Sequence, residues 1–203
     1  MMRLGYWIAR ALGDEGRLMR LSASPDALLA ELSGRRVALV GNARSLSDRS
    51  DGAEIDAADL VIRLNGAPVP SPISHGSRTD WMAMSVPVEA GVIAARNPQR
   101  LLWMTPRRKR LPWRIASDPR FALAPAAWNA RLADELGARP TTGLMVIDLL
   151  ARSEAREARL HGFDFFASLS LSGGRAAKEV PHDFAAEKTW VERLATRDKR
   201  FVL

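Results

Sequence analysis

Cysteine is absent from this 203-residue chain, so no disulfide can form and no thiolate can serve as a nucleophile or metal ligand. Histidine is scarce: His75, His161 and His182 are too scattered along the chain to predict a zinc site. Aromatic residues make up only 6% of the chain, so most of the core must come from Leu, Val, Ile and Ala. These absences fit a reducing compartment, and we expect neither a metal ion nor a cofactor.

The amino-terminal end has no long hydrophobic run. The stretch from Met1 to Gly13 is too short to span a bilayer, and Arg3 and Arg10 interrupt it. It also lacks the apolar run and cleavage site of a signal peptide. We therefore interpret this stretch as a helix and expect a cytoplasmic protein.

Acidic residues are fewer than basic ones. The chain has 30 Lys and Arg against 23 Asp and Glu, a formal net charge of +7, which favours anionic partners. The densest basic run, at residues 107–110 with Arg114 close by, is most simply a solvated loop. It would also suit peripheral contact with an anionic membrane or with an acidic acceptor. No recognisable nucleic-acid-binding motif accompanies it, so we expect no specific nucleic acid partner.

Short apolar runs alternate with helical patterns along the chain. The apolar runs predict strands at residues 36–41, 59–64, 79–84, 100–104, 156–161 and 201–203. Apolar residues at helical spacing predict helices at residues 16–32, 87–96, 126–136, 141–154 and 183–196. Ser24 can cap a second half of the first helix, and Gly137 can close the third.

This alternation predicts one α/β domain over residues 1–203, with residues 1–32 as an N-terminal helical segment. Its sheet should be mostly parallel and twisted, and helices should flank both faces. The active site of such a sheet lies in the loops at the carboxyl ends of its strands.

The first candidate site follows two of these strands. Gly41 lets the backbone leave the first strand tightly and approach a ligand closely, and Asn42 comes next. Asn65 ends the second strand, so its amide can face the same crevice. Because asparagine both donates and accepts hydrogen bonds, this pair suits the ribose, base and phosphate edges of a nucleotide.

Two polar residues near these sites are interpreted as structural. Arg63 lies two residues before Asn65, and we expect it to pair with Asp56 or Asp59. His161 is expected to occupy a strand end.

The second candidate site is the start of the helix predicted at residues 141–154. The N–H groups in the first turn of a helix are unsatisfied and can bind a phosphate or carboxylate. Thr141 and Thr142 add hydroxyl donors, and Gly143 lacks a side chain that would block the approach. The alternative, which this segment alone favours, is a plain threonine N-cap.

The third candidate site pairs His182 with Glu187, five residues later. A histidine has an unperturbed pKa of about 6.5, which suits a general base for an acceptor hydroxyl. Glu187 could orient the imidazole if the loop bends back, meet the donor, or only decorate the helix. A histidine at a helix start is usually a cap or surface residue, so this pair alone is a weak signal.

In combination, these segments resemble the sialylmotifs of the animal sialyltransferases. Residues 40–68 carry V-G-N, I-D and V-x-R-x-N-x-A-P in order, as the large sialylmotif does, and residues 76–79 match its G-x-x-T tail. Residues 140–143 read P-T-T-G and precede G-F at 162–163, as in the small sialylmotif. Residues 182–187 match the very small sialylmotif, H-x-x-x-x-E.

The resemblance spans most of the chain and implies a Rossmann-like variant of the GT-A fold. It implies that a CMP-activated donor is bound by Gly41, Asn42, Asn65, Thr141, Thr142 and Gly143. His182 is then the catalytic base and Glu187 a supporting residue. The implied reaction is a metal-independent direct displacement with inversion.

The chain departs from the family's pattern in three ways. The paired cysteines of the two longer motifs are absent, and Val37 stands near the first such place. Motif III, an aromatic and histidine element, is missing, so its phosphate contact must come from Arg175, Lys178 or Ser172, or is lost. The chain is also shorter than the family's usual catalytic domain, so the animal acceptors are not carried over.

The sequence therefore predicts a bacterial glycosyltransferase that moves sialic acid or Kdo from a CMP donor to a glycan or lipid-linked saccharide. We expect it in the cytoplasm, with peripheral contact at the inner membrane face. Two alternatives stay open. A non-catalytic nucleotide-binding domain of the same fold would bind donor without turnover. A basic nucleic-acid-binding protein would show salt-sensitive binding that CMP does not affect.

Overall fold

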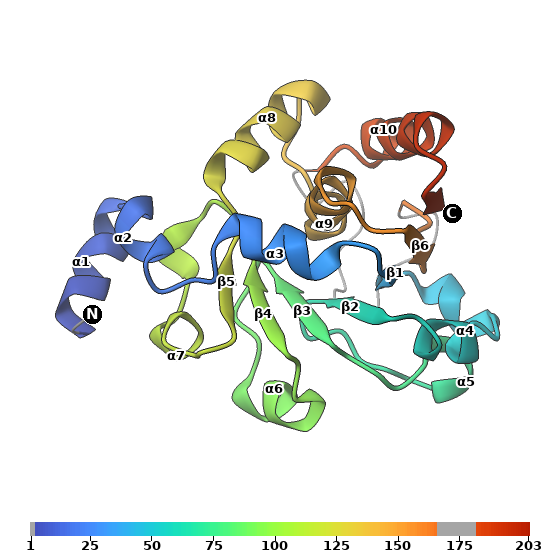
Figure 1. The fold of residues 1–203 in the computed structure, drawn as a ribbon, viewed down its shortest axis with the longest axis horizontal. Coiled ribbons are helices and arrows are strands. Elements are labelled where there is room, and N and C mark those ends of the chain that lie inside the picture. Colours follow the sequence, from blue (N-terminus) through green and yellow to red (C-terminus); the bar gives the residue numbers. More distant parts are fainter. Residues whose placement is uncertain (1–2, 166–181) are drawn as a thin grey trace.

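Seven strands form one sheet in the computed structural model, which describes residues 3–165 and 182–203 (Figure 1). The strand order is β5-β4-β3-β2-β1-β6-β7, and every neighbouring pair is parallel. The strands are β1 Arg36–Val40, β2 Leu60–Leu64, β3 Trp81–Met84, β4 Arg100–Trp103, β5 Phe121–Leu123, β6 Glu157–His161 and β7 Phe201–Val202. The predicted parallel α/β sheet is confirmed.

Helices connect the strands. The α-helices of the described residues are α1 Arg3–Leu12, α2 Glu15–Met19, α3 Pro25–Leu32, α4 Gly52–Asp56, α5 Pro72–His75, α6 Ala90–Arg96, α7 Trp113–Ala116, α8 Ala126–Leu136, α9 Thr142–Arg152 and α10 Phe184–Arg197. Two short 3₁₀ segments are η1 Arg44–Asp48 and η2 Arg108–Arg110. Within the ranges described, no helix has the length and apolar character needed to cross a membrane.

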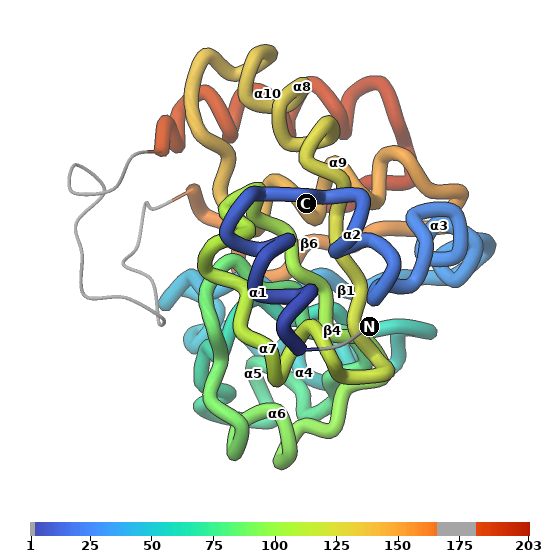
Figure 2. The backbone as a smooth tube through the Cα atoms, turned by 90° about the vertical axis from the view of Figure 1, so that its left-hand side faces the viewer, coloured from blue at the N-terminus to red at the C-terminus, as the bar shows by residue number. Residues whose placement is uncertain are grey.

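Apolar side chains cover both faces of the sheet, because successive residues of a strand point to opposite sides. On β1, Val37 and Leu39 face one side while Ala38 and Val40 face the other, and all four are buried. Helices α3, α8, α9 and α10 pack on the Val37 side. The opposite side is covered by α1, α2, α6 and α7 over β3 to β5, and by α4 with η1 over β1 and β2. The sheet is thus the middle of three layers (Figures 1 and 2).

Two predicted helix caps are present. The Ser24 hydroxyl accepts a hydrogen bond from Ala27 N at 3.1 Å, so α3 starts where the helical pattern is interrupted. Gly137 closes α8 with a left-handed backbone, φ 65°. The sequence does not predict β5, and it places the start of α6 too early: Glu89 is extended, and α6 begins at Ala90.

The expected pairing of Arg63 with Asp56 or Asp59 is wrong. Arg63 is buried, and its guanidinium donates to two main-chain carbonyls, Arg78 O and His75 O, each at 2.7 Å. It thereby fixes the chain that leads from α5 into β3, and its role is structural, as expected.

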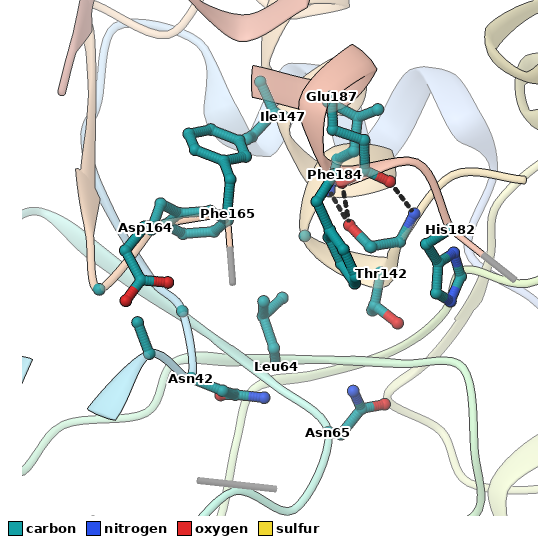
Figure 3. A pocket seen from close by; sticks show the side chains of 17 residues that line it. Asn42, Leu64, Asn65, Thr142, Ile147, Asp164, Phe165, His182, Phe184 and Glu187 are labelled. Carbon is teal, nitrogen blue, oxygen red and sulfur yellow. Dashed lines mark hydrogen bonds between the residues drawn. The ribbon is translucent and has the colours of Figure 1, made fainter. Parts of the chain in front are cut away.

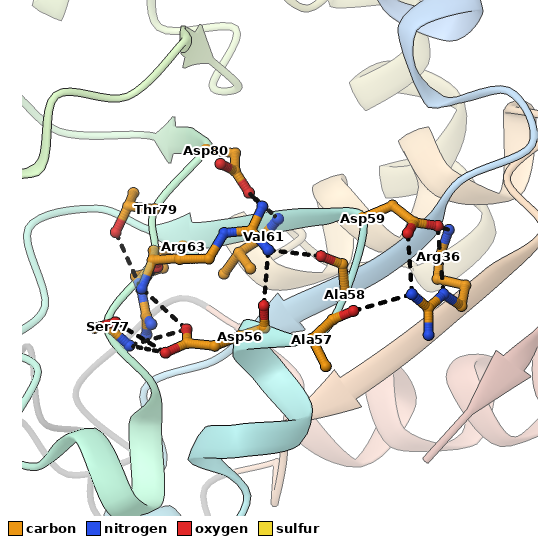
Figure 4. Close-up of polar contacts among 11 residues, drawn as sticks. Arg36, Asp56, Ala57, Ala58, Asp59, Val61, Arg63, Ser77, Thr79 and Asp80 are labelled. Carbon is orange, nitrogen blue, oxygen red and sulfur yellow. Dashed lines mark hydrogen bonds and ion pairs between the residues drawn. The ribbon is translucent and has the colours of Figure 1, made fainter.

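The two carboxylates have other partners (Figure 4). Asp56 accepts from Ser77 N at 2.9 Å and from Arg78 N at 3.0 Å, while Asp59 pairs with Arg36 at 3.0 Å. The I-D element, in the connection between β1 and β2, is thereby tied to the G-x-x-T element, in the connection between β2 and β3.

Candidate active site

The eight residues predicted to bind the donor or to act in catalysis line one cavity of about 250 Å³ at the carboxyl edge of the sheet (Figure 3). They are Gly41, Asn42, Asn65, Thr141, Thr142, Gly143, His182 and Glu187. The first three follow β1 and β2, the next three begin α9, and the last two lie at the start of α10. The parallel topology brings these distant segments together because the carboxyl ends of the strands share one edge.

Gly41 allows two loops to touch. Its N–H donates to His161 O at 2.7 Å, and a Cβ on Gly41 would lie 2.3 Å from Gly162 O. No side chain fits at that distance, so glycine is required here. The close contact packs the loop after β1 on the loop after β6 and places Asn42 in the cavity wall.

Asn65 is held in one orientation. Its backbone is left-handed, φ 52°, which is uncommon for a residue other than glycine. Its Oδ1 accepts a hydrogen bond from Ser85 N at 3.0 Å, across the ends of β2 and β3. Because Oδ1 is engaged by Ser85, Asn65 presents its Nδ2 donor to the cavity (Figure 3).

The hydroxyl groups of Thr141 and Thr142 are engaged within the protein, whereas two main-chain N–H groups at the start of α9 are available to a ligand. Thr141 is the N-cap, since its Oγ1 accepts from Leu144 N at 3.1 Å. Thr142 Oγ1 is hydrogen-bonded to Ser85 Oγ at 2.8 Å. In the described part of the chain, the first-turn N–H groups of Thr142 and Gly143 meet no acceptor, so they can bind an anion.

The sequence suggested that the missing side chain of Gly143 leaves room for a ligand. In the structure, it makes room for an aromatic ring. A Cβ on Gly143 would lie 2.7 Å from Cε1 of Phe163. Phe163, which belongs to the G-F element, therefore packs directly on the first turn of α9. Phe165 and Phe184 line the same cavity and were not identified from the sequence. These rings give it an apolar wall, as in most small-molecule sites.

Glu187 is hydrogen-bonded to Thr141. Orienting His182 was one of the roles that the sequence left open for it. Its Oε1 accepts from Thr141 N and its Oε2 from Thr141 Oγ1, each at 2.7 Å. Only 3% of Glu187 is exposed, and this burial raises the pKa of its carboxyl to about 7 against the opposing effect of the two Thr141 hydrogen bonds. Glu187 thus positions the N-cap of α9.

His182 is fixed from the α8–α9 connection. Its Nδ1 lies 2.8 Å from Arg139 O. A carbonyl only accepts, so Nδ1 carries the hydrogen, and in the neutral ring Nε2 keeps its lone pair. Burial lowers the pKa of His182, and the charges of Arg139 and Arg107 lower it further. The imidazole is therefore neutral near pH 7 and can accept a proton.

The arginines beside His182 were not identified from the sequence as site residues. Burial lowers the pKa of Arg139, and the nearby charges of Arg107 and Arg110 add to that effect. Over residues 3–165 and 182–203, none of these three arginines has a carboxylate within ion-pair distance. One available signal was the position of Arg139, directly before the P-T-T-G element.

The basic run at residues 107–110 is only partly the solvated loop that we favoured. Arg108 is buried, pairs with Glu15 at 3.0 Å and donates to Ala124 O at 2.6 Å. Its neighbours in the run are exposed.

The remaining predicted residues fall into two groups. His161 is buried at the end of β6, with Nδ1 3.0 Å from Asp51 Oδ2, as expected for a structural histidine. Arg175, Lys178 and Ser172 lie outside the described residues. The described residues bring together no set of His, Asp or Glu side chains that could hold a metal ion.

Sequence and structure comparisons relate the chain to known proteins. The sequence model of Glycosyltransferase family 29 (sialyltransferase) matches residues 17–102. A mammalian sialyltransferase, solved in complex with Gal-beta-1-3GalNAc-ortho-nitrophenol, is 19% identical, with a TM-score of 0.64 over 99% of this chain and 85% of that one. The sialyltransferase CstII from Campylobacter jejuni, in complex with the substrate analogue CMP-3FNeuAc, is 12% identical, with a TM-score of 0.57 over 80% and 78%. No curated protein matches in sequence. The family model covers less than half of the chain, and the structural likeness confirms the predicted fold.

Proposed function

Because the chain is sialyltransferase-like in its motifs and fold, we propose that it is a glycosyltransferase that uses a CMP-activated donor. The sugar transferred is an acidic keto-sugar, sialic acid or Kdo, and the acceptor is a glycan or a lipid-linked saccharide. One observation carries the proposal: three separated motifs meet in one cavity, beside a histidine whose Nε2 can take up a proton.

In the proposed complex, the start of α9 binds the CMP phosphate. The N–H groups of Thr142 and Gly143 would donate to its oxygens, and the partial positive charge of the helix terminus adds to this attraction. Asn65 Nδ2 and the amide of Asn42 would bind the nucleoside. The role of Glu187 is indirect, since it holds Thr141 and therefore the first turn of the helix.

His182 is the proposed general base. Its Nε2 removes the proton of the acceptor hydroxyl as that oxygen attacks the anomeric carbon of the donor sugar. The bond from this carbon to the CMP phosphate oxygen breaks, and the configuration at the carbon inverts. Negative charge develops on the departing phosphate, where the N–H groups of α9 are already aimed and need no reorganisation.

The first experiment is calorimetric titration of CMP into the wild-type protein and Asn42→Ala, with and without EDTA. We expect binding that EDTA does not change and that Asn42→Ala weakens by about tenfold, the loss typical of one hydrogen bond to a charged or polar ligand group. Thr189→Ala is the control, because Thr189 lies on α10 with its hydroxyl donating to Ala185 O. Absence of CMP binding by the wild type would refute the donor site.

Turnover is tested next with CMP-sialic acid and CMP-Kdo, with His182→Asn as the inactive comparison. Transfer that depends on His182 supports the enzyme. Tight CMP binding without turnover of either donor would instead favour the non-catalytic nucleotide-binding domain.

A further inference from the structure

The first helix has an apolar face that no other described residue covers. Leu4 is 70% exposed, Trp7 39%, Ile8 43% and Leu12 77%. Their spacing places them along one side of α1, and we call this side the α1 stripe. The other large exposed apolar residues of the described chain are not on α1. A continuous apolar strip on the surface indicates an interaction site, whereas single exposed residues do not.

Contacts made by the opposite side of α1 fix the orientation of the α1 stripe toward solvent. Tyr6 is fully buried, its hydroxyl donates to Leu111 O, and its ring centroid lies 4.9 Å from that of Trp113. Helix α1 therefore cannot turn its apolar side inward without losing these contacts. It lies at one end of the molecule, next to the N-terminus (Figures 1 and 2).

Basic side chains border the α1 stripe. Arg3 and Arg10 are seven residues apart and so lie along one edge of it. The Arg10 guanidinium is 4.9 Å from the Trp7 ring centroid and donates to Lys109 O, which brings the exposed Lys109 and Arg110 to the same end of the molecule. In the part of the chain that the structure describes, Arg3, Lys109 and Arg110 form no ion pair.

We propose that the α1 stripe and its basic border dock the protein on an anionic membrane surface. In that arrangement the apolar side chains enter the boundary between headgroups and acyl chains, while arginine and lysine meet the anionic headgroups. Tryptophan, here Trp7, is a favoured residue at this depth. A second copy of the chain is a poorer partner for this face, because pairing two such faces would bring like charges together.

Docking through α1 also brings the cavity edge toward the membrane. Helix α1 packs on residues 108–111, which follow the carboxyl end of β4. The same connection contains Arg107, whose charge acts on His182. The docking proposal does not depend on the transfer reaction, but it would place this connection, which contains Arg107, on the membrane side.

Vesicle co-sedimentation tests the proposal. The probes are vesicles of phosphatidylcholine alone and vesicles of phosphatidylcholine with phosphatidylglycerol. We expect binding to the anionic vesicles, and about tenfold weaker binding for Leu4→Ser or Leu12→Ser, because each removes an apolar side chain from the stripe. The matched control is Ile73→Ser: Ile73 is 72% exposed but lies on α5, so binding should not change.

A second pair of variants tests the contribution of basic side chains to vesicle binding. Lys109→Gln should weaken binding to the anionic vesicles by about fivefold, because one cation near such a surface contributes about that factor. Lys199→Gln removes another exposed charge, near the C-terminus and outside the α1 stripe, and should leave binding unchanged. CMP titration of all the variants shows whether the cavity is intact.

Three results would overturn the docking proposal. One is equal binding to neutral and anionic vesicles, and another is loss of binding in Ile73→Ser as large as in Leu4→Ser. The third is a dimer in sedimentation velocity that Leu4→Ser dissociates, without vesicle binding, since the stripe would then join two copies. Failure of CMP binding with normal vesicle binding would refute the proposed function alone.

Discussion

Replacing Glu187 by glutamine is expected to remove a pH dependence from the folding stability. The Glu187 carboxyl is buried under the first turn of α9 and accepts two hydrogen bonds from Thr141. Burial raises its pKa from 4.5 to about 7, so the folded protein holds this proton more tightly than the unfolded chain does. The resulting stabilisation is complete below about pH 4.5 and is lost as the pH rises through about 7.

The size of this loss follows from the shift. One pKa unit corresponds to about 1.4 kcal/mol, so the shift from 4.5 to about 7 corresponds to about 3 kcal/mol at most. Glutamine has nearly the same shape and no charge at any pH. The free energy of unfolding of Glu187→Gln minus that of the wild type should therefore rise by about 3 kcal/mol from pH 4.5 to above pH 7.

Urea unfolding of both proteins across this pH range measures the difference. Glu192→Gln is the matched control, because Glu192 is on the same helix but exposed, with its carboxylate 3.9 Å from Lys188 Nζ. Its stability curve should stay parallel to that of the wild type. If the Glu187→Gln curve were also parallel, the carboxyl would titrate as an ordinary surface group, and the argument from burial would be refuted.

Other predictions concern the base and the loop contact. His182→Asn should lower kcat by about a hundredfold or more while CMP still binds, because only the proton acceptor is lost. Arg107→Gln should shift the acid limb of the pH–rate profile to higher pH, because the Arg107 charge helps to lower the pKa of His182. Unchanged limbs would show that Arg107 does not act on the base. Gly41→Ala should unfold at a much lower denaturant concentration than the wild type, because its Cβ would lie 2.3 Å from Gly162 O. Gly91→Ala, with nothing within 4 Å, should instead be neutral or gain roughly 0.5–1 kcal/mol.

The fold was largely predictable because its signals are local. The β1 and β2 strands are short buried apolar runs, and Ser24 and Gly137 mark helix ends with side chains and φ values that suit few other positions. Strand β5 was missed since it has three residues, Phe121–Leu123, too few to show a period.

The membership of the site was predictable, but the bonds within it were not. Three motifs identified residues that share one cavity. The partners of Glu187 and His182, which are Thr141 and Arg139, are more than 40 positions away in the sequence, and no spacing rule links them. Arg63 illustrates the same limit: besides Thr79 Oγ1, it donates to two main-chain carbonyls, which every residue has and no pattern can distinguish.

The tether between His182 and Arg139 has a consequence for protein engineering. His182 and Glu187 are both anchored across the cavity, to residues 139 and 141, so contacts with the α8–α9 side hold the start of α10. Insertions or deletions in the α8–α9 connection are therefore expected to displace the base, although His182 lies 43 positions later in the sequence.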